Sequence, residues 1–122
     1  MSRQTRVLVI DDNESHAEAV AEGLQRDGYE TLKAMSGAEG AELLKTEPVH
    51  VVVTDLVMPG MSGRELVERI RQLAPGLRIL CTSGYVMPAD KQAGTGYLQK
   101  PFTSAELLAK VKQILSSKPP VD

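Results

Sequence analysis

Short runs of apolar, largely β-branched residues alternate along this chain with segments that have the apolar spacing of amphipathic helices. Three runs, at 6–10, 50–54 and 77–82, show no alternation of polar and apolar side chains. That pattern is typical of strands that are buried on both faces of a parallel sheet. Two more polar runs, at 29–34 and 97–99, are expected to be edge strands. Alternating strands and helices in one chain restrict the fold to the α/β class.

The expected helices lie between these strands. Apolar residues recur at helical spacing over 14–27 and 63–74. The pairs Ser36 with Glu39 and Thr103 with Glu106 have capping-box spacing, and they predict helices over 37–46 and after residue 103. Residues 86–95 contain proline and glycine with little apolar periodicity, so a short or irregular fourth helix is expected there.

Five strand–helix units predict a doubly wound parallel sheet. The crossovers between parallel strands are right-handed, which leaves few topologies. Polar strands at the edges and apolar ones inside favour the flavodoxin-like (βα)5 fold with strand order 2-1-3-4-5. Such sheets bind ligands beyond the carboxyl ends of the strands, where the first and third strands are neighbours.

Composition narrows the class of protein further. A chain of 122 residues fits one domain, which we expect over residues 1–116 with a tail or linker at 117–122. A single cysteine excludes an internal disulfide and predicts a cytoplasmic protein. No apolar run is long enough to insert into a membrane. With 3% aromatic residues and a net charge of −2, the domain is not expected to bind nucleic acid.

Reactive side chains follow four of the predicted strands. Asp11 and Asp12 follow the first strand and Asp55 ends the third, so three carboxylates should converge. Thr82 and Ser83 end the fourth strand, and Lys100 follows the fifth. A lone aspartate after a strand is more often a helix cap, but four strand ends with a complementary set favour a functional site.

This set of groups suits phosphoryl transfer to a carboxylate. Clustered carboxylates repel one another, and Mg²⁺ with oxygen ligands relieves that repulsion. An aspartate oxygen can attack phosphorus and form an acyl phosphate. Catalysis of such a transfer consists mainly of positioning and charge neutralisation, which Mg²⁺ and a lysine would supply.

The sequence resembles the receiver domain of two-component response regulators over residues 5–116. The motifs that carry the resemblance are VLVIDDN (7–13), VVVTDLVMPGMSG (51–63), LCTSGY (80–85) and GYLQKPF (96–102). These motifs are most similar to those of receivers attached to hybrid sensor histidine kinases. The resemblance implies a phosphoacceptor signalling domain that is no enzyme beyond its own phosphorylation and dephosphorylation.

The family's roles carry over by position. The resemblance implies that Asp55 accepts the phosphoryl group, that Asp12, Asp55 and the backbone carbonyl of Val57 ligate Mg²⁺, and that Asp11 acts through a bound water. Lys100 would contact the phosphoryl group. Ser83 and Tyr97 would be the switch hydroxyl and aromatic residue, and Gly84, which leaves room for phosphoryl oxygens, favours Ser83 over Thr82. Tyr85 would modulate access of hydrolytic water, and Pro101 would follow a cis peptide bond.

The same resemblance implies the partners. The phosphoryl donor would be a sensor histidine kinase or a histidine phosphotransfer domain, and the downstream partner is a protein that the sequence does not name. The stretch from Ser83 to Lys100 is shorter than in most receivers. This departure argues against the family's standard dimer and a transcription-factor output, while a phosphorylation-dependent dimer, a hybrid kinase and a stand-alone regulator stay open.

Three other functions are alternatives for the same fold. A flavodoxin-like cofactor-binding domain would need a glycine-rich loop in place of Asp11, Asp12 and Asn13. An aspartyl-phosphate phosphatase would need a second acid at position 57, which is valine. A third alternative is a docking domain that acts without phosphorylation. His16 and His50 are expected to be ordinary surface or strand-start residues, and Cys81 a small buried apolar residue.

Overall fold

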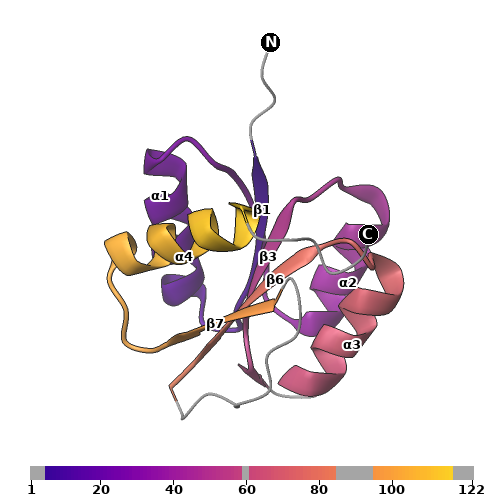
Figure 1. The fold of residues 1–122 in the computed structure, drawn as a ribbon. Coiled ribbons are helices and arrows are strands. Elements are labelled where there is room, and N and C mark those ends of the chain that lie inside the picture. Colours follow the sequence, from indigo (N-terminus) through magenta and orange to yellow (C-terminus); the bar gives the residue numbers. More distant parts are fainter. Residues whose placement is uncertain (1–4, 59–60, 85–94, 117–122) are drawn as a thin grey trace.

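The computed structural model describes residues 5–58, 61–84 and 95–116. Within these residues, five parallel strands form the main sheet, and four helices flank it (Figure 1). The strands are β1 (Arg6–Ile10), β2 (Glu30–Ala34), β3 (Val51–Asp55), β6 (Arg78–Ser83) and β7 (Thr95–Gln99). The helices are α1 (Glu14–Arg26), α2 (Gly37–Thr46), α3 (Gly63–Leu73) and α4 (Ser104–Ser116).

The strand order is β2-β1-β3-β6-β7, which is the predicted 2-1-3-4-5 arrangement. Helices α1 and α4 cover one face of the sheet, and α2 and α3 cover the other (Figure 1). Because β1 and β3 are paired in register, the residues that follow Ile10 and end β3 emerge at one edge. The topology therefore brings the two acidic motifs together before any side-chain contact is considered.

Both faces of the central strands are buried. In β1, Val7 and Val9 pack towards α1 and α4, whereas Leu8 and Ile10 pack towards α2 and α3. All five residues of β3 are buried as well. This two-sided burial explains why the strands are continuous apolar runs without alternation. The edge strands β2 and β7 are only partly buried, as their polar sequences predicted.

The helix starts follow the predicted capping chemistry. Ser36 Oγ accepts a hydrogen bond of 3.1 Å from the Glu39 amide at the start of α2. At the start of α4, the Glu106 amide donates to Thr103 Oγ1 and the Thr103 amide donates to Glu106 Oε1, at 3.1 and 3.0 Å. This reciprocal pair satisfies two amide groups that the helix itself leaves without partners.

Two details differ from the sequence-based expectation. The last strand begins at Thr95 rather than at residue 97, because Gly96 pairs with Leu80 in β6. A Cβ atom at Gly96 would lie 3.2 Å from Ile114 Cδ1 and 3.3 Å from Leu80 Cδ1, so a side chain would crowd the core there. A small antiparallel pair, β4 (Val57–Met58) with β5 (Met61–Ser62), was not predicted.

Three predictions fall on parts of the chain outside the described residues. The expected fourth helix at 86–95 lies there up to residue 94, and Thr95 belongs to β7. The expected tail at 117–122 also lies outside the described residues, as does Tyr85.

Candidate functional site

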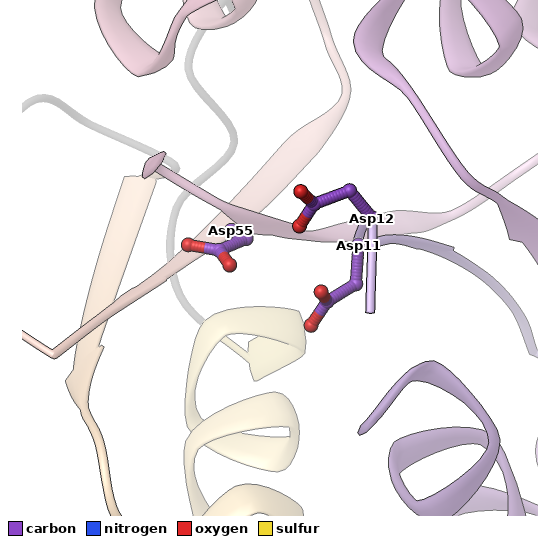
Figure 2. Close-up of side chains that lie close together, drawn as sticks. All are labelled: Asp11, Asp12 and Asp55. Carbon is purple, nitrogen blue, oxygen red and sulfur yellow. The ribbon is translucent and has the colours of Figure 1, made fainter. Parts of the chain in front are cut away.

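Three carboxylates meet at the carboxyl edge of the sheet (Figure 2). Asp11 and Asp12 directly follow β1, and Asp55 is the last residue of β3. One oxygen from each carboxylate can be chosen so that all three lie within 4.8 Å of one another. Asp11 and Asp55 are buried, at 3% and 8% exposure, while Asp12 is exposed. The cluster is thus open to solvent on the side of Asp12.

Hydrogen bonds of the loop between β1 and α1 fix the position of Asp11. Its backbone amide donates to the Ala34 carbonyl at 3.0 Å, which extends the pairing of β1 with β2 by one residue. Its Oδ1 accepts a hydrogen bond of 2.9 Å from the Asn13 amide. Asn13 in turn caps α1, because its Oδ1 accepts from the His16 amide at 3.1 Å. The acidic motif is therefore built into the helix start.

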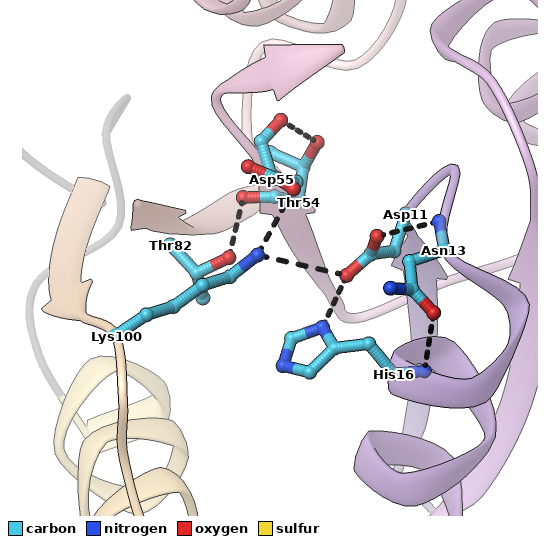
Figure 3. Close-up of polar contacts among 7 residues, drawn as sticks. All are labelled: Asp11, Asn13, His16, Thr54, Asp55, Thr82 and Lys100. Atoms are coloured by element: carbon cyan, nitrogen blue, oxygen red, sulfur yellow. Dashed lines mark hydrogen bonds and ion pairs between the residues drawn. The ribbon is translucent and has the colours of Figure 1, made fainter. Parts of the chain in front are cut away.

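Lys100 supplies a positive charge to the cluster (Figure 3). Its Nζ lies 3.0 Å from Asp55 Oδ2 and 4.0 Å from Asp11 Oδ2. Its backbone amide donates to the Ser83 carbonyl at 2.7 Å, which ties the end of β7 to the end of β6. The Lys100–Pro101 peptide bond is cis, as predicted.

The donor set of the site fits a hard divalent cation. Three carboxylates face one ammonium group, so negative charge is in excess at this point. Such an excess is costly where two of the carboxylates are buried, unless a further cation balances it. Carboxylate oxygens are the ligands that Mg²⁺ takes in proteins, usually together with water and phosphate oxygens.

The two adjacent hydroxyls of β6 have different surroundings. Thr82 Oγ1 donates a long hydrogen bond of 3.5 Å to the Thr54 carbonyl, so it is engaged within the sheet (Figure 3). Ser83 is the last residue of β6 and is 4% exposed. Among the residues that the structure describes, no atom lies within 4 Å of the place that a Cβ atom at Gly84 would take. The assignment of Ser83 as the switch hydroxyl stays a prediction.

The structure also describes the surroundings of Tyr97, Val57 and Cys81. Tyr97 is partly buried in β7 and packs on the α2–α3 side of the core. Val57 stands in β4, two residues after Asp55, opposite Ser62. Cys81 is buried, and this burial raises the pKa of its thiol to about 12, which fits the predicted role as a small core residue.

Sequence reasoning missed the contact made by His16. Its Nδ1 forms a hydrogen bond with Asp11 Oδ2 (Figure 3). Its ring also lies edge-on to the ring of Phe102. The spacing of five residues from Asp11 matches no common ligand motif, so the sequence offered no signal for it. His50 does behave as a strand-start residue, since its Nδ1 accepts a hydrogen bond of 2.9 Å from the Arg6 amide.

Comparison with known proteins identifies the family. The profile of the response regulator receiver domain matches residues 7–112 of this chain. The chain belongs to this family. The receiver domain is a signalling module of two-component systems, and its action depends on phosphorylation. This membership favours the receiver interpretation over a flavodoxin-like cofactor-binding domain.

The relatives of this chain include proteins of different kinds and lengths. The chain is 33% identical to the sensor kinase CckA of Brucella abortus over 94% of its own length, but over 13% of that kinase. It spans about half the length of other curated relatives that it matches. Receiver domains interact with histidine kinases or phosphotransfer proteins. A receiver in a hybrid kinase and a stand-alone regulator both agree with these matches.

Solved structures match nearly end to end. The chemotaxis protein CheY4 of Vibrio cholerae superposes with a TM-score of 0.84 at 31% identity, covering 92% of this chain and 99% of that one. The response regulator TrrA of Thermotoga maritima, in complex with Mg²⁺ and beryllium fluoride, superposes with a TM-score of 0.82 at 32% identity, covering 91% and 99%. No helix within the described residues is both long and apolar enough to cross a membrane.

Proposed function

We propose that this receiver domain accepts a phosphoryl group on Asp55 in a Mg²⁺-dependent transfer from phosphohistidine. One observation carries the proposal: Asp55 Oδ2 lies 3.0 Å from Lys100 Nζ, and the Asp55 carboxylate belongs to a cluster of three within 4.8 Å. The acyl phosphate on Asp55 would therefore form next to the Lys100 ammonium group and the proposed cation site. Both would neutralise the charge that develops on its oxygens.

The transfer balances without any further reactant. An Asp55 carboxylate oxygen attacks phosphorus, and a P–O bond forms while the P–N bond to the donor histidine breaks. The electron pair of that bond stays on the imidazole nitrogen. This nitrogen takes up a proton from solvent, which leaves a neutral imidazole. With a small donor such as acetyl phosphate, a P–O bond breaks instead and acetate leaves. Both reactions give an acyl phosphate on Asp55.

The acidic residues would hold the metal ion. Asp12 and Asp55 would ligate Mg²⁺ directly, together with the backbone carbonyl of Val57, and Asp11 would act through a bound water. Bound there, the ion would supply positive charge in addition to that of Lys100. The complex of the relative TrrA with Mg²⁺ and beryllium fluoride supports this part of the proposal, as does the oxygen-only donor set.

The proposed switch uses the residues at the ends of β6 and β7. Phosphorylation adds about −1.5 to −2 charges at one point, together with strong acceptor oxygens. The Ser83 hydroxyl would move towards the phosphoryl group, and Tyr97 would turn inward into the vacated space. The surface around β7 would then differ between the two states and would be read by a downstream protein.

Acetyl phosphate labelling tests the function directly. With Mg²⁺ present, intact-protein mass spectrometry should show the added mass of one phosphoryl group, and chelation of Mg²⁺ should abolish it. Asp55→Asn should remove the labelling altogether, because an amide oxygen is a poor nucleophile. Asp27→Asn is the matched control, since Asp27 caps the far end of α1 and pairs with Lys112. Labelling of Asp55→Asn to the wild-type extent would refute the proposal.

A further inference from the structure

We propose that His16 is a positioning residue for the acidic cluster. Its imidazole holds one oxygen of Asp11 and thereby leaves Lys100 to serve Asp55. This inference deepens the proposed function and rests on it, because it concerns how the cation site and the phosphoacceptor share a single lysine.

The first support is the hydrogen bond between His16 Nδ1 and Asp11 Oδ2. An ionised carboxylate can only accept, so the ring proton lies on Nδ1. The other oxygen, Asp11 Oδ1, accepts from the Asn13 amide at 2.9 Å. Each oxygen of Asp11 thus has a donor of its own, one from the loop backbone and one from α1. Together they fix the rotation of a carboxylate whose side chain is 4% exposed.

The second support is what lies against the ring. The His16 and Phe102 ring centroids are 5.7 Å apart, with an interplanar angle of 68°, which is the edge-to-face geometry that aromatic pairs favour. Phe102 packs against the core between the sheet and helices α1 and α4. His16 therefore touches both segments that form the site: the loop after β1, which carries Asp11, and the segment after β7, which carries Lys100.

The third support is the unequal position of Lys100. Its Nζ is 3.0 Å from Asp55 Oδ2 but 4.0 Å from Asp11 Oδ2, the same oxygen that His16 binds. Without the imidazole, this nearly buried oxygen would lose its closest donor, and leaving such an oxygen unsatisfied is costly. Lys100 is the cation within reach, so it would be drawn towards Asp11 and away from Asp55.

The consequence is measurable as metal affinity in the unphosphorylated protein. Groups that hydrogen-bond to metal-binding side chains keep them oriented, and their loss costs about 10–100-fold in affinity. A lysine drawn further into the acidic cluster would also compete with the cation. His16→Leu removes the donor while keeping bulk against Phe102. His16→Asn places an amide NH₂ near the position of Nδ1 and so restores the donor.

The experiment is a Mg²⁺ titration followed by NMR, with the backbone amides of the loop after β1 as the readout. We expect His16→Leu to weaken Mg²⁺ binding by about 10-fold and His16→Asn to recover most of that loss. His50→Leu is the matched control, because His50 bonds to the Arg6 amide at the opposite edge of the sheet. It should leave the Mg²⁺ affinity unchanged.

A spectroscopic readout tests the contact itself without metal. The Nδ1-bound proton of His16 should give a resonance protected from solvent exchange, and Asp11→Ala should abolish it. If that resonance is absent from the wild-type protein, the positioning contact is refuted.

The two failures are distinguishable. Wild-type protein that binds no Mg²⁺ and takes no label refutes the proposed function, and the present inference falls with it. Wild-type protein that binds Mg²⁺, while His16→Leu binds it equally well, refutes the role of His16 alone. Equal weakening by His16→Leu and His16→Asn also refutes it, since a mere packing defect would then explain both.

Discussion

Charged clusters lie at both ends of the parallel strands, which we call the amino edge and the carboxyl edge of the sheet. The two clusters are built differently. At the amino edge, Arg6 pairs with Glu30 at 2.6 Å and with Glu47 at 3.7 Å. These side chains are 24%, 44% and 41% exposed. At the carboxyl edge, Asp11 and Asp55 are 4% and 10% exposed at the side chain, and Lys100 is 26% exposed.

The contrast shows which cluster is structural and which is reactive. At the amino edge both carboxylates remain partly exposed to solvent, which screens their charge, so their pairing adds little free energy. At the carboxyl edge three carboxylates converge on one ammonium group and two of them are buried, so negative charge is left unbalanced. An arrangement of that kind is costly to keep and is typical of a functional site.

The largest expected difference between the two edges concerns their cations. Lys100→Ala should slow phosphorylation by acetyl phosphate by about 100-fold, the usual cost of removing one charge-stabilising group from a transition state. Arg6→Ala should leave the labelling rate unchanged, because Arg6 lies at the opposite edge. Time courses of intact mass for the two variants provide the measurement. Equal rates in both variants would break the contrast.

Lys100→Ala also separates metal binding from the switch. Because Mg²⁺ is held by the carboxylates, the variant should still bind Mg²⁺, but the signal at Tyr97 should no longer respond to beryllium fluoride. NMR of the Tyr97 ring measures this, with wild-type protein as the control. If the Tyr97 shifts induced by beryllium fluoride are the same in both proteins, Lys100 does not couple the two.

Addition of Mg²⁺ should stabilise the folded protein through the carboxyl edge only. At a Mg²⁺ concentration about 100 times Kd, binding to the folded state should raise the free energy of unfolding by about 2.7 kcal/mol. Asp12→Asn should lose this stabilisation, whereas Glu30→Gln, at the amino edge, should retain it. Urea unfolding with Mg²⁺ or a chelator gives both values. Retention of the full effect in Asp12→Asn would contradict the proposed ligand set.

The smallest expected effect is measured without Mg²⁺. There, the free energy of unfolding should change in opposite directions in two variants. Asp12→Asn removes one of three repelling carboxylates and should raise the free energy of unfolding, whereas Glu30→Gln removes a partner of Arg6 and should lower it. Each change should be about 0.5–1 kcal/mol, as for other exposed charges. Urea unfolding in chelator measures both. Changes of the same sign would mean that the two edges do not differ as described.

The fold could be predicted because its signals are local. The runs around Val7–Leu8 and Val51–Val52 lie on both faces of the sheet, so burial alone explains their composition. The helix starts at Ser36 and Thr103 follow from capping chemistry over four residues. The start of β7 was missed because Gly96 shows no strand preference of its own, and its pairing with Leu80 depends on the tertiary structure.

Only the part of the site that lies at strand ends could be predicted from the sequence. Asp11, Asp55 and Lys100 each adjoin a strand end, so strand order alone brings them together. His16 reaches Asp11 through the geometry of a helix cap at Asn13, which turns α1 so that its first turn faces the cluster. No periodic pattern encodes that orientation. The difference between Thr82 and Ser83 likewise depends on a contact with Thr54.

The position of the phosphoryl group, which we propose to be Asp55, can be measured directly. Protein labelled with acetyl phosphate and Mg²⁺ is reduced with borohydride, which converts an acyl phosphate to the corresponding alcohol, and is then mapped by peptide mass spectrometry. The account predicts one reduced residue, at position 55, and none when Mg²⁺ is chelated. Reduction at Asp11 or Asp12, or a label that borohydride leaves unchanged, would contradict it.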